Sequence, residues 1–257
     1  MVEMTSPPPP PAPGDVHLWF FEAATLQPCL ESLHGDLSDP DREASDHYVT
    51  EVERRRFSLY RGAFRRVLSW YEGCRTANLA ISRGRHGKPS HRVVSPVTSP
   101  EKREEPDSGI SFNITHSHEY SVLAVGLNAE LGIDVERIRL PRDLSSLVRQ
   151  FFCSEEIAAV EAASPEQRAR LFCSIWTRKE AAVKYMGGSL AEWIGVLQVT
   201  RHNPGSPIVQ DGVPELYLTE FTVGAGYLGC LCTDYPSPRI TSFRLSCSGW
   251  SFRDERH

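Results

Sequence analysis

A pair of carboxylates inside an apolar run constrains the fold of this chain more than any other feature. The segment Gly132–Glu136 lies in a β-branched, apolar stretch that predicts a strand, and Gly132 predicts a turn or a close approach at its start. Residues i and i+2 of a strand point to the same face, so Asp134 and Glu136 share a face. Two carboxylates this close repel each other unless a cation neutralises them. The pair is either part of a Mg²⁺ site or an ordinary solvated strand face.

A third carboxylate lies on a predicted helix. Residues Ser164–Gln167 combine an N-cap serine, a proline at the first helical position and a glutamine that would close a capping box. The helix is therefore expected to run from Ser164 to about Tyr185, with Gly187 and Gly188 ending it.

Three charged residues lie within or beside the apolar stripe of this helix. The stripe is predicted from helical spacing and contains Phe172, Ile175, Trp176 and Val183. Lys179 falls inside the stripe, and Glu180 and Lys184 form an i, i+4 pair at its edge. Either the pair is an ordinary surface pair and Lys179 extends its stem along apolar surface, or all three residues line a cleft. In the second case Glu180 completes a metal site and the lysines bind phosphate.

A histidine lies between two further predicted strands. Phe112–Ser117 leads into the hydrophobic run Tyr120–Gly126, which indicates a strand, a turn that carries His116, and a second strand. A histidine beside threonine and serine hydroxyls can donate to a phosphate oxygen. A turn histidine can equally be structural or merely exposed, and we assign His118 to the surface.

In this order the motifs resemble the signature of the 4′-phosphopantetheinyl transferase superfamily. They are Phe-Asn-Ile-Thr-His-Ser from Phe112, Gly-Ile-Asp-Val-Glu from Gly132 and Trp-x-x-Lys-Glu-Ala-x-x-Lys from Trp176. Gly-Lys-Pro from Gly87 and the arginines before a long helix, at Arg54–Arg56, are also similar to family elements. The resemblance covers roughly residues 36 to 200, and the chain length is similar to the single-chain, surfactin-type branch.

The resemblance implies an α+β fold of two similar α/β halves in a pseudo-twofold arrangement, each a small sheet with helices on one face. Residues 15–130 would form the N-terminal half, which binds coenzyme A. Residues 131–257 would form the C-terminal half, which carries the metal site and the catalytic helix. The implied reaction transfers the 4′-phosphopantetheine arm of coenzyme A to a serine of an apo acyl or peptidyl carrier protein. The products are the holo carrier and adenosine 3′,5′-bisphosphate, so the enzyme would be a holo-acyl-carrier-protein synthase.

The resemblance also implies roles for the matching residues. The expected Mg²⁺ ligands are Asp134, Glu136 and Glu180. The expected catalytic residues are Glu180, as general base for the acceptor serine, Lys184 and His116. The expected coenzyme A contacts are Arg56, Lys88, Pro89, Thr115, His116, Lys179 and Lys184. Such a site needs cations and strong donors, because coenzyme A carries a pyrophosphate and a 3′-phosphate.

The chain departs from the family pattern at three places. Thr115 replaces a serine but keeps the hydroxyl, and Gly187-Gly188 lacks a lysine that relatives place between the glycines. Residues 91–109, rich in proline and charge, are predicted to be an inserted loop without chemistry.

An apolar surface for the carrier protein is expected after the catalytic helix, and it contains Tyr185, Met186, Leu190 and Trp193. Trp193 can equally belong to the core.

Composition excludes several classes of protein. A net charge of −5 argues against a nucleic-acid binder, and no apolar run is long enough to span a membrane. The N-terminus lacks the features of a signal peptide, and residues 1–14, with a Pro7–Pro11 run, are expected to be a disordered tail. Seven cysteines without metal-ligand spacing predict reduced thiols in a cytoplasmic protein, which we expect to be a monomer.

The remaining elements are predicted from periodicity. In the first half we expect a strand at Val16–Phe21, a helix at Asp46–Tyr71 with Arg61, Arg65 and Arg66 on its solvated face, and a strand at Asn78–Ser82 in the first sheet. In the second half we expect helices around Leu144–Phe152 and after Ser154, and strands near Val196–Thr200, Glu215–Thr222, Tyr227–Thr233 and Ile240–Leu245.

Two other functions remain open from sequence. One is a different Mg²⁺-dependent enzyme that uses a nucleotide. The other is a non-catalytic module that binds carrier proteins and kept the fold, although the intact carboxylates and Lys184 argue against it. Incubation with coenzyme A and an apo carrier would separate these alternatives.

Overall fold

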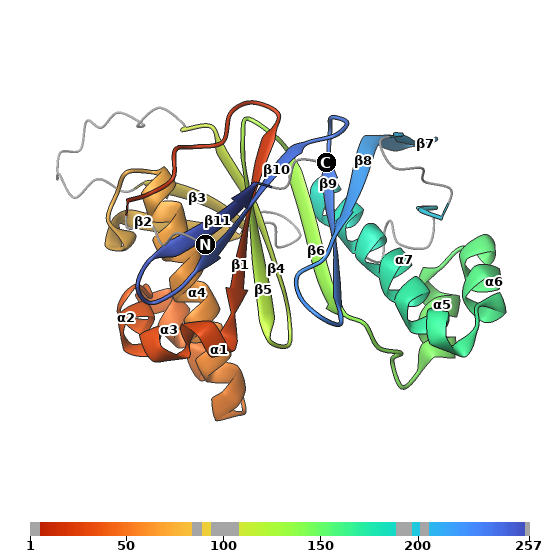
Figure 1. Ribbon diagram of the computed structural model, residues 1–257, viewed down its shortest axis with the longest axis horizontal. Helices are drawn as coiled ribbons and strands as arrows, with labels where there is room; N and C mark the ends of the chain where they lie inside the picture. The colour runs from red at the N-terminus through yellow and green to blue at the C-terminus, as the bar shows by residue number, and fades with distance from the viewer. Residues whose placement is uncertain (1–5, 84–88, 94–107, 189–196, 201–205, 255–257) are drawn as a thin grey trace.

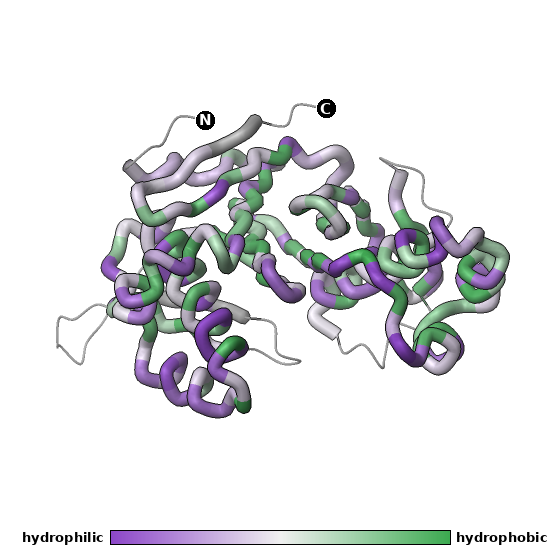
Figure 2. Tube along the Cα trace, turned by 60° about the horizontal axis from the view of Figure 1, so that its bottom comes forward, coloured by the Kyte–Doolittle hydropathy of each residue, from purple (hydrophilic) through white to green (hydrophobic). Residues whose placement is uncertain are grey.

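The computed structural model describes residues 6–83, 89–93, 108–188, 197–200 and 206–254. Mixed α/β structure fills these ranges, and its layers run helices, sheet, sheet, helices (Figure 1). Hydrophobic segments concentrate along the central strands, whereas the helices alternate hydrophobic and hydrophilic positions (Figure 2). No helix in the described ranges is long and apolar enough to cross a membrane.

The first sheet has five strands in the order β11-β10-β1-β5-β4. Their bounds are β1 Asp15–Glu22, β4 Ile110–Ser117, β5 Tyr120–Leu127, β10 Arg239–Leu245 and β11 Trp250–Asp254. β1 runs parallel to β10, and the other neighbours are antiparallel. The predicted strand at Ile240–Leu245 therefore exists, but it lies in the first sheet and not with its sequence neighbours in the second half.

Helices cover one face of the first sheet. They are α1 Ala23–Leu26, the 3-10 turn Gln27–Cys29, α2 Leu30–Gly35, α3 Asp39–Asp46, α4 Glu51–Tyr71 and the 3-10 turn Thr76–Asn78. α4 begins at a capping box in which Thr50 and Glu53 satisfy each other's backbone N–H groups. Its apolar side packs with Trp19 and Phe21 of β1 in one core. β2 (Leu79–Arg83) was expected in the first sheet, but it pairs with β3 (Pro89–Val93) in a separate hairpin.

The second sheet is antiparallel, with the order β6-β9-β8-β7. Its strands are β6 Leu131–Arg137, β7 Ile208–Gln210, β8 Val213–Phe221 and β9 Tyr227–Thr233. Its outer face is covered by α7 Pro165–Met186, and α5 Leu144–Phe151 and α6 Ser154–Ala162 pack beside α7. Leu197 and Val199 are buried, but residues 197–200 form no strand, so the strand predicted there is wrong in its described part.

α7 packs so closely against β6 that there is no room for a side chain at Gly132. A Cβ at Gly132 would lie 1.9 Å from the carbonyl oxygen of Ala181, so the sequence prediction of a close approach is confirmed. α7 begins after the N-cap Ser164 and ends at Gly187, whose φ of 67° lies in the left-handed region. The capping box predicted at its start does not form, because the Ser164 side chain accepts no bond from the helix backbone.

A third core lies between the two sheets. It combines the second face of β1, including Val16 and Leu18, with Ile133 and Val135 of β6. Since alternate residues of β6 point in opposite directions, Asp134 and Glu136 face away from this core and toward α7. β4 and β6, the edge strands of the two sheets, run side by side (Figure 1).

The predicted solvated face of α4 is wrong. The Arg65 side chain is only 2 % exposed and donates to the carbonyl oxygens of Thr76 and Leu79 and to the Asp41 carboxylate. Arg61 also donates to Asp41, and Arg66 donates to Asp36. The reason is that residues 39–46 form a separate helix, α3, which brings Asp41 against α4.

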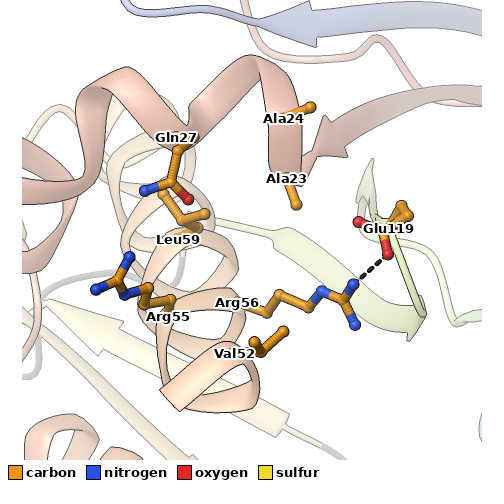
Figure 3. Close-up of a pocket in the computed structure, with 8 residues that line it drawn as sticks. All are labelled: Ala23, Ala24, Gln27, Val52, Arg55, Arg56, Leu59 and Glu119. Atoms are coloured by element: carbon orange, nitrogen blue, oxygen red, sulfur yellow. Dashed lines mark hydrogen bonds and ion pairs between the residues drawn. The ribbon is translucent and has the colours of Figure 1, made fainter.

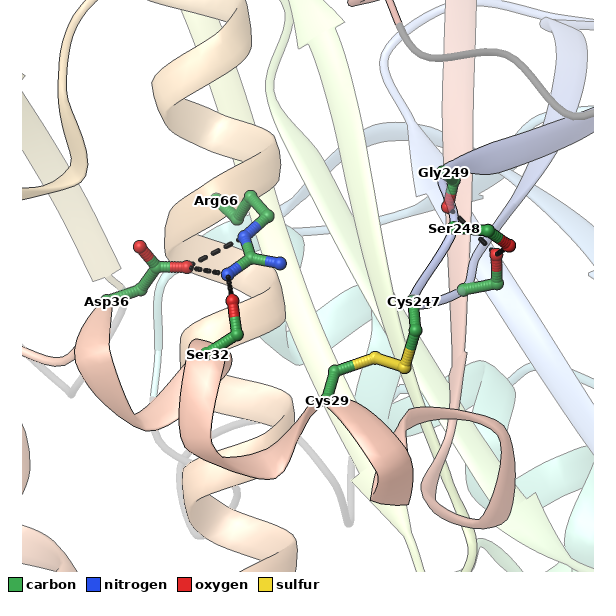
Figure 4. Close-up of a disulfide and its surroundings, with 8 residues drawn as sticks. Cys29, Ser32, Asp36, Arg66, Cys247, Ser248 and Gly249 are labelled. Atoms are coloured by element: carbon green, nitrogen blue, oxygen red, sulfur yellow. Dashed lines mark hydrogen bonds and ion pairs between the residues drawn. A yellow bond between two sulfur atoms is a disulfide. The ribbon is translucent and has the colours of Figure 1, made fainter.

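Two other expectations from sequence are corrected. Cys29 and Cys247 form a disulfide with a Cα–Cα distance of 5.4 Å, so these two thiols are not reduced (Figure 4). The other five cysteines, all within the described residues, are not in disulfides. In the Pro-rich tail, residues 6–14 are described, Pro8 and Pro11 are buried, and the Trp250 indole donates to the Ser6 carbonyl, so this part is ordered against the first sheet.

Candidate functional site

The carboxylate pair lies where β4, β6 and α7 meet. Asp134 is 4 % exposed, and its Oδ1 accepts from Thr115 Oγ1 at 2.9 Å and from Lys184 Nζ at 2.8 Å. Lys184 Nζ also lies 3.4 Å from Thr115 Oγ1. The three side chains come from three different elements, so the site requires both sheets and α7 to be in place.

Glu136 lies one pleat further along β6. Its Oε2 accepts from Ser117 Oγ at 2.8 Å. Burial and the nearby charge of Asp134 raise the pKa of Glu136, and the hydrogen bond from Ser117 opposes that rise.

Glu180 faces the pair from α7. Burial, followed by the charge of Asp134, raises the pKa of Glu180 to about 7, while Lys184 acts in the opposite direction and Glu136 adds to the rise. A carboxyl group with a pKa near neutrality can both hold and release a proton at physiological pH. The sequence prediction that Asp134, Glu136, Glu180 and Lys184 converge therefore agrees with their placement.

These carboxylates suit a metal ion that is bound jointly by the protein and by a substrate phosphate. Asp134 Oδ2 is buried and has no hydrogen-bond partner among the described residues. Within those residues, no group of three or more His, Cys, Asp or Glu side chains stands ready to hold a metal by itself. Mg²⁺ commonly takes one or two carboxylates and completes its octahedron with water and substrate phosphates. An unpaired carboxylate oxygen beside two mutually repelling acids fits that mode, and a closed protein cage is not formed.

His116 lies on β4 between the two hydroxyl residues. Strand alternation turns it to the side of the first core, and it is exposed. Partial burial of the ring lowers the pKa of His116, as does the charge of Lys184, while Asp134 opposes the change. The lowered pKa favours the neutral ring, in which one nitrogen donates a hydrogen bond and the other accepts one.

Lys179 does not line the site, which corrects its predicted phosphate contact. Its side chain is fully buried, and Nζ lies 2.9 Å from Glu156 Oε2 and donates to the Leu197 carbonyl. Glu156 also accepts from the backbone N–H groups of Val199 and Cys153. A buried ammonium requires such a partner, so Lys179 joins α6 and α7 and is not available to a ligand.

Arg56 borders a pocket of about 310 Å³ on the first half, between α1, the start of α4 and the β4–β5 turn (Figure 3). The pocket wall combines apolar residues, such as Ala23, Val52 and Leu59, with the charged Arg55 and Glu119. Arg56 points across it toward Glu119, with which it forms an ion pair (Figure 3). Arg56 is therefore close to a cavity but is separate from the carboxylate cluster.

The other predicted contacts are only partly described. Lys88, Leu190 and Trp193 lie outside the described residues, as do residues 94–107 of the predicted loop. Pro89 is the first residue of β3. Tyr185 and Met186 are half-buried against the core of the second half, so their side chains are not a free surface.

Sequence reasoning missed Ser117, which supports the site, and Glu156, which supports α7. Ser117 holds Glu136, and Glu156 holds Lys179. The signal for Ser117 was present, because polar residues recur at alternate positions 111, 113, 115 and 117 of this strand. No comparable signal marks Glu156, which resembles any acid in the first turn of a helix.

Comparison with known proteins shows which family this chain resembles. The sequence profile described as the 4′-phosphopantetheinyl transferase superfamily matches residues 130–232, which contain β6 and α7. The chain is 30 % identical over 178 residues to the 4′-phosphopantetheinyl transferase HetI of Nostoc sp., covering 69 % of this chain and 71 % of HetI. It is 36 % identical to AcpT of Salmonella typhimurium over 51 % of this chain and 65 % of AcpT. It is 26 % identical to Sfp of Bacillus subtilis over 49 % of this chain and 55 % of Sfp, and both are 4′-phosphopantetheinyl transferases.

Proposed function

This chain belongs to the 4′-phosphopantetheinyl transferase superfamily, and we propose that it transfers the 4′-phosphopantetheine arm of coenzyme A to a serine of an apo carrier protein. The observation that carries this proposal is the convergence of Asp134, Glu136, Glu180 and Lys184 at the junction of β4, β6 and α7. Three acids and one lysine at one place suit a pyrophosphate that is bound together with a divalent cation.

The residues have distinct roles in this proposal. The serine oxygen of the carrier attacks the phosphorus next to the pantetheine. The bond from that phosphorus to the oxygen of adenosine 3′,5′-bisphosphate breaks as the new ester forms. Glu180 accepts the serine proton, for which a pKa of about 7 is suited. Lys184, already held beside Asp134, places its charge where negative charge develops on the leaving phosphate.

Asp134, Glu136 and Glu180 would hold Mg²⁺ together with the pyrophosphate. The ion would neutralise phosphate charge when bound. Asp134 Oδ2 is the ligand atom that fits best, because it is buried without a partner among the described residues. Asp134 Oδ1 is already occupied by Thr115 and Lys184, and it orients the carboxylate for this role.

Coenzyme A would extend from this cluster over the first half. His116 and Thr115 lie on β4 beside the carboxylates, and Arg56 borders the pocket. Lys88 and Pro89 remain proposed contacts by resemblance alone. The pseudo-twofold relation of the two halves is proposed as well, supported by one sheet with an outer helical layer in each. The monomeric state and the cytoplasmic location stay predictions.

The intact mass of an apo carrier protein tests the reaction. After incubation with coenzyme A and MgCl₂, its mass should increase by one phosphopantetheine with the wild-type chain and not with Asp134→Asn. Glu161→Gln, on the exposed side of α6, is the matched acid-to-amide control and should remain active. If no member of a panel of acyl and peptidyl carriers gains this mass, the proposed function is wrong. Consumption of a nucleotide without carrier modification would favour a different Mg²⁺-dependent enzyme.

A further inference from the structure

Side chains of β4 hydrogen-bond to the backbone of β6 across the junction of the two sheets. Ile133 N–H donates to Asn113 Oδ1 at 3.3 Å, Val135 N–H to Thr115 Oγ1 at 3.4 Å, and Arg137 N–H to Ser117 Oγ at 3.3 Å. Donors and acceptors both advance by two residues. We call these three contacts the β4–β6 seam.

The seam replaces a backbone ladder. In the described strands, β4 pairs by its backbone with β5, and β6 pairs with β9. The N–H groups on the free edge of β6 would therefore be buried without partners if the side chains of β4 did not accept from them. Asn113, Thr115 and Ser117 are all at least nine-tenths buried, so water does not substitute for them.

Two residues of the seam, Thr115 and Ser117, also hydrogen-bond to the carboxylates of β6. A hydroxyl has one hydrogen and two lone pairs, so a hydroxyl that accepts from a backbone N–H can still donate once. Thr115 donates to Asp134 and Ser117 donates to Glu136. Asn113 accepts in the same way, but none of its described hydrogen bonds reaches a carboxylate.

The direction of the Ser117 hydroxyl follows from its neighbours. Its oxygen lies 2.8 Å from Glu136 Oε2 and 3.3 Å from His118 Nδ1. The carboxylate oxygen is the closer and stronger acceptor, so the hydrogen points to Glu136. Glu136 is repelled by Asp134 and is only half-buried, and a free side chain would turn toward solvent.

We propose that Ser117 is a positioning residue that holds the Glu136 carboxylate beside Asp134 and Glu180, ready for a divalent cation. This inference rests on the proposed function only in assigning the cation to these acids. It adds that the junction of the two sheets and the metal site are built from the same hydroxyls. A shift between the sheets would therefore move Ser117 and Glu136 together.

The test compares two members of the seam. Ser117→Ala and Asn113→Ala each remove one bond to the β6 backbone, but only Ser117→Ala removes a bond to a carboxylate. Binding of Mn²⁺, as a spectroscopic substitute for Mg²⁺, is measured by electron paramagnetic resonance with and without coenzyme A, and unfolding is followed in urea. Ser117→Ala should weaken Mn²⁺ binding on the order of ten-fold, the usual effect of losing a charge-assisted hydrogen bond. Asn113→Ala should change it less than about two-fold while lowering stability comparably.

Further variants keep the inference falsifiable. Ser117→Thr retains the hydroxyl and should bind Mn²⁺ like the wild type, even if Ser117→Ala folds poorly. In a Glu136→Gln background, replacing Ser117 by alanine should no longer affect Mn²⁺ binding. Equal Mn²⁺ affinities for wild type and Ser117→Ala would overturn this inference alone. A wild-type chain that binds no Mn²⁺ with coenzyme A present would overturn both the inference and the proposed metal role. The mass of the carrier protein is measured separately, and it tests the proposed transfer reaction independently of Mn²⁺ binding.

Discussion

At the scale of single residues, two lysines on one helix show how position decides the role of a charge. Lys184 is partly exposed and bonds to Asp134, in the site. Lys179, five residues earlier, is fully buried and bonds to Glu156, on the far side of α7. Both lie in the motif that suggested phosphate binding, and only the surrounding elements distinguish them.

We therefore expect Lys179→Met to act on stability and not on ligand binding. It leaves the Glu156 carboxylate buried without its partner, which should cost about 3–5 kcal/mol of unfolding free energy. The double variant Lys179→Met with Glu156→Gln should recover part of that loss, as urea unfolding would show. Lys184→Met is the matched comparison and should instead weaken coenzyme A binding in calorimetry. Weakened coenzyme A binding by a folded Lys179→Met protein would contradict the assignment.

His17 predicts how stability changes with pH. It is buried, and its Nδ1 lies 2.8 Å from the Tyr71 hydroxyl oxygen, which also accepts from the Trp19 indole N–H. Burial lowers the pKa of His17 from 6.5 to about 4, with Asp15 raising it and Arg239 lowering it further. Below pH 6.5 the unfolded chain takes up a proton that the folded chain does not.

Stability should therefore fall as the pH drops from 6.5 toward 4, by roughly 3 kcal/mol from this group. Urea unfolding of wild type and His17→Gln over this range isolates the contribution of His17. The difference in unfolding free energy between the two proteins should change with pH in favour of the variant as acid is added. A difference that is constant between pH 4 and pH 7 would show that His17 titrates normally.

At the scale of elements, the contact of β6 with α7 sets the geometry of the site. Gly132→Ala would force a methyl group against the Ala181 carbonyl and the Tyr185 backbone, so α7 must move away. Because Glu180 and Lys184 lie on that part of α7, Gly132→Ala should lower both stability and coenzyme A affinity, measured by urea unfolding and calorimetry. Gly35→Ala is the control, since a Cβ there meets nothing within 4 Å. Unchanged coenzyme A affinity in Gly132→Ala would show that the position of α7 does not determine coenzyme A binding.

The elements that carry the site could be predicted from sequence because their signals are local. Alternation placed Asp134 and Glu136 on one face of β6, and helical spacing with Gly187 placed the end of α7. The burial of Arg65 could not be predicted, because its partners lie in α3 and in the backbone near Leu79. The burial of Lys179 depends in the same way on α6. A charge on a helix indicates its role only when the facing element is known.

At the scale of the whole molecule, a disulfide joins the helical layer of the first half to the segment that follows β10 of the first sheet. Cys29 lies in the helical layer and Cys247 follows β10, 218 residues later in the chain (Figure 4). The bond ties the segment after β10 to the helical layer, and neither cysteine lies in the carboxylate cluster.

Reduction of this disulfide, or Cys29→Ser, should lower the unfolding free energy by about 2–5 kcal/mol, because the unfolded chain gains freedom. Coenzyme A affinity of the folded protein should stay unchanged. Alkylation of the denatured, unreduced protein followed by intact mass should modify five thiols, and seven after reduction. Seven modified thiols without reductant would show that the bond does not form, and Cys74→Ser is a control for removal of a thiol that is not in the disulfide.

β10 belongs to the first sheet although it follows the second sheet in the sequence, and this order affects how the protein folds during synthesis. β1 has β10 as its parallel neighbour, and the paired residues Asp15 and Arg239 are 224 positions apart. The described strands and helices between β5 and β10 build the second sheet and its helical layer, which makes that unit an insertion within the first. On the ribosome, β1 lacks its parallel partner until β10 has emerged, 224 residues after the start of β1. Such non-local pairing slows folding, so the second sheet can form first, and this edge of β1 stays unpaired until β10 is available.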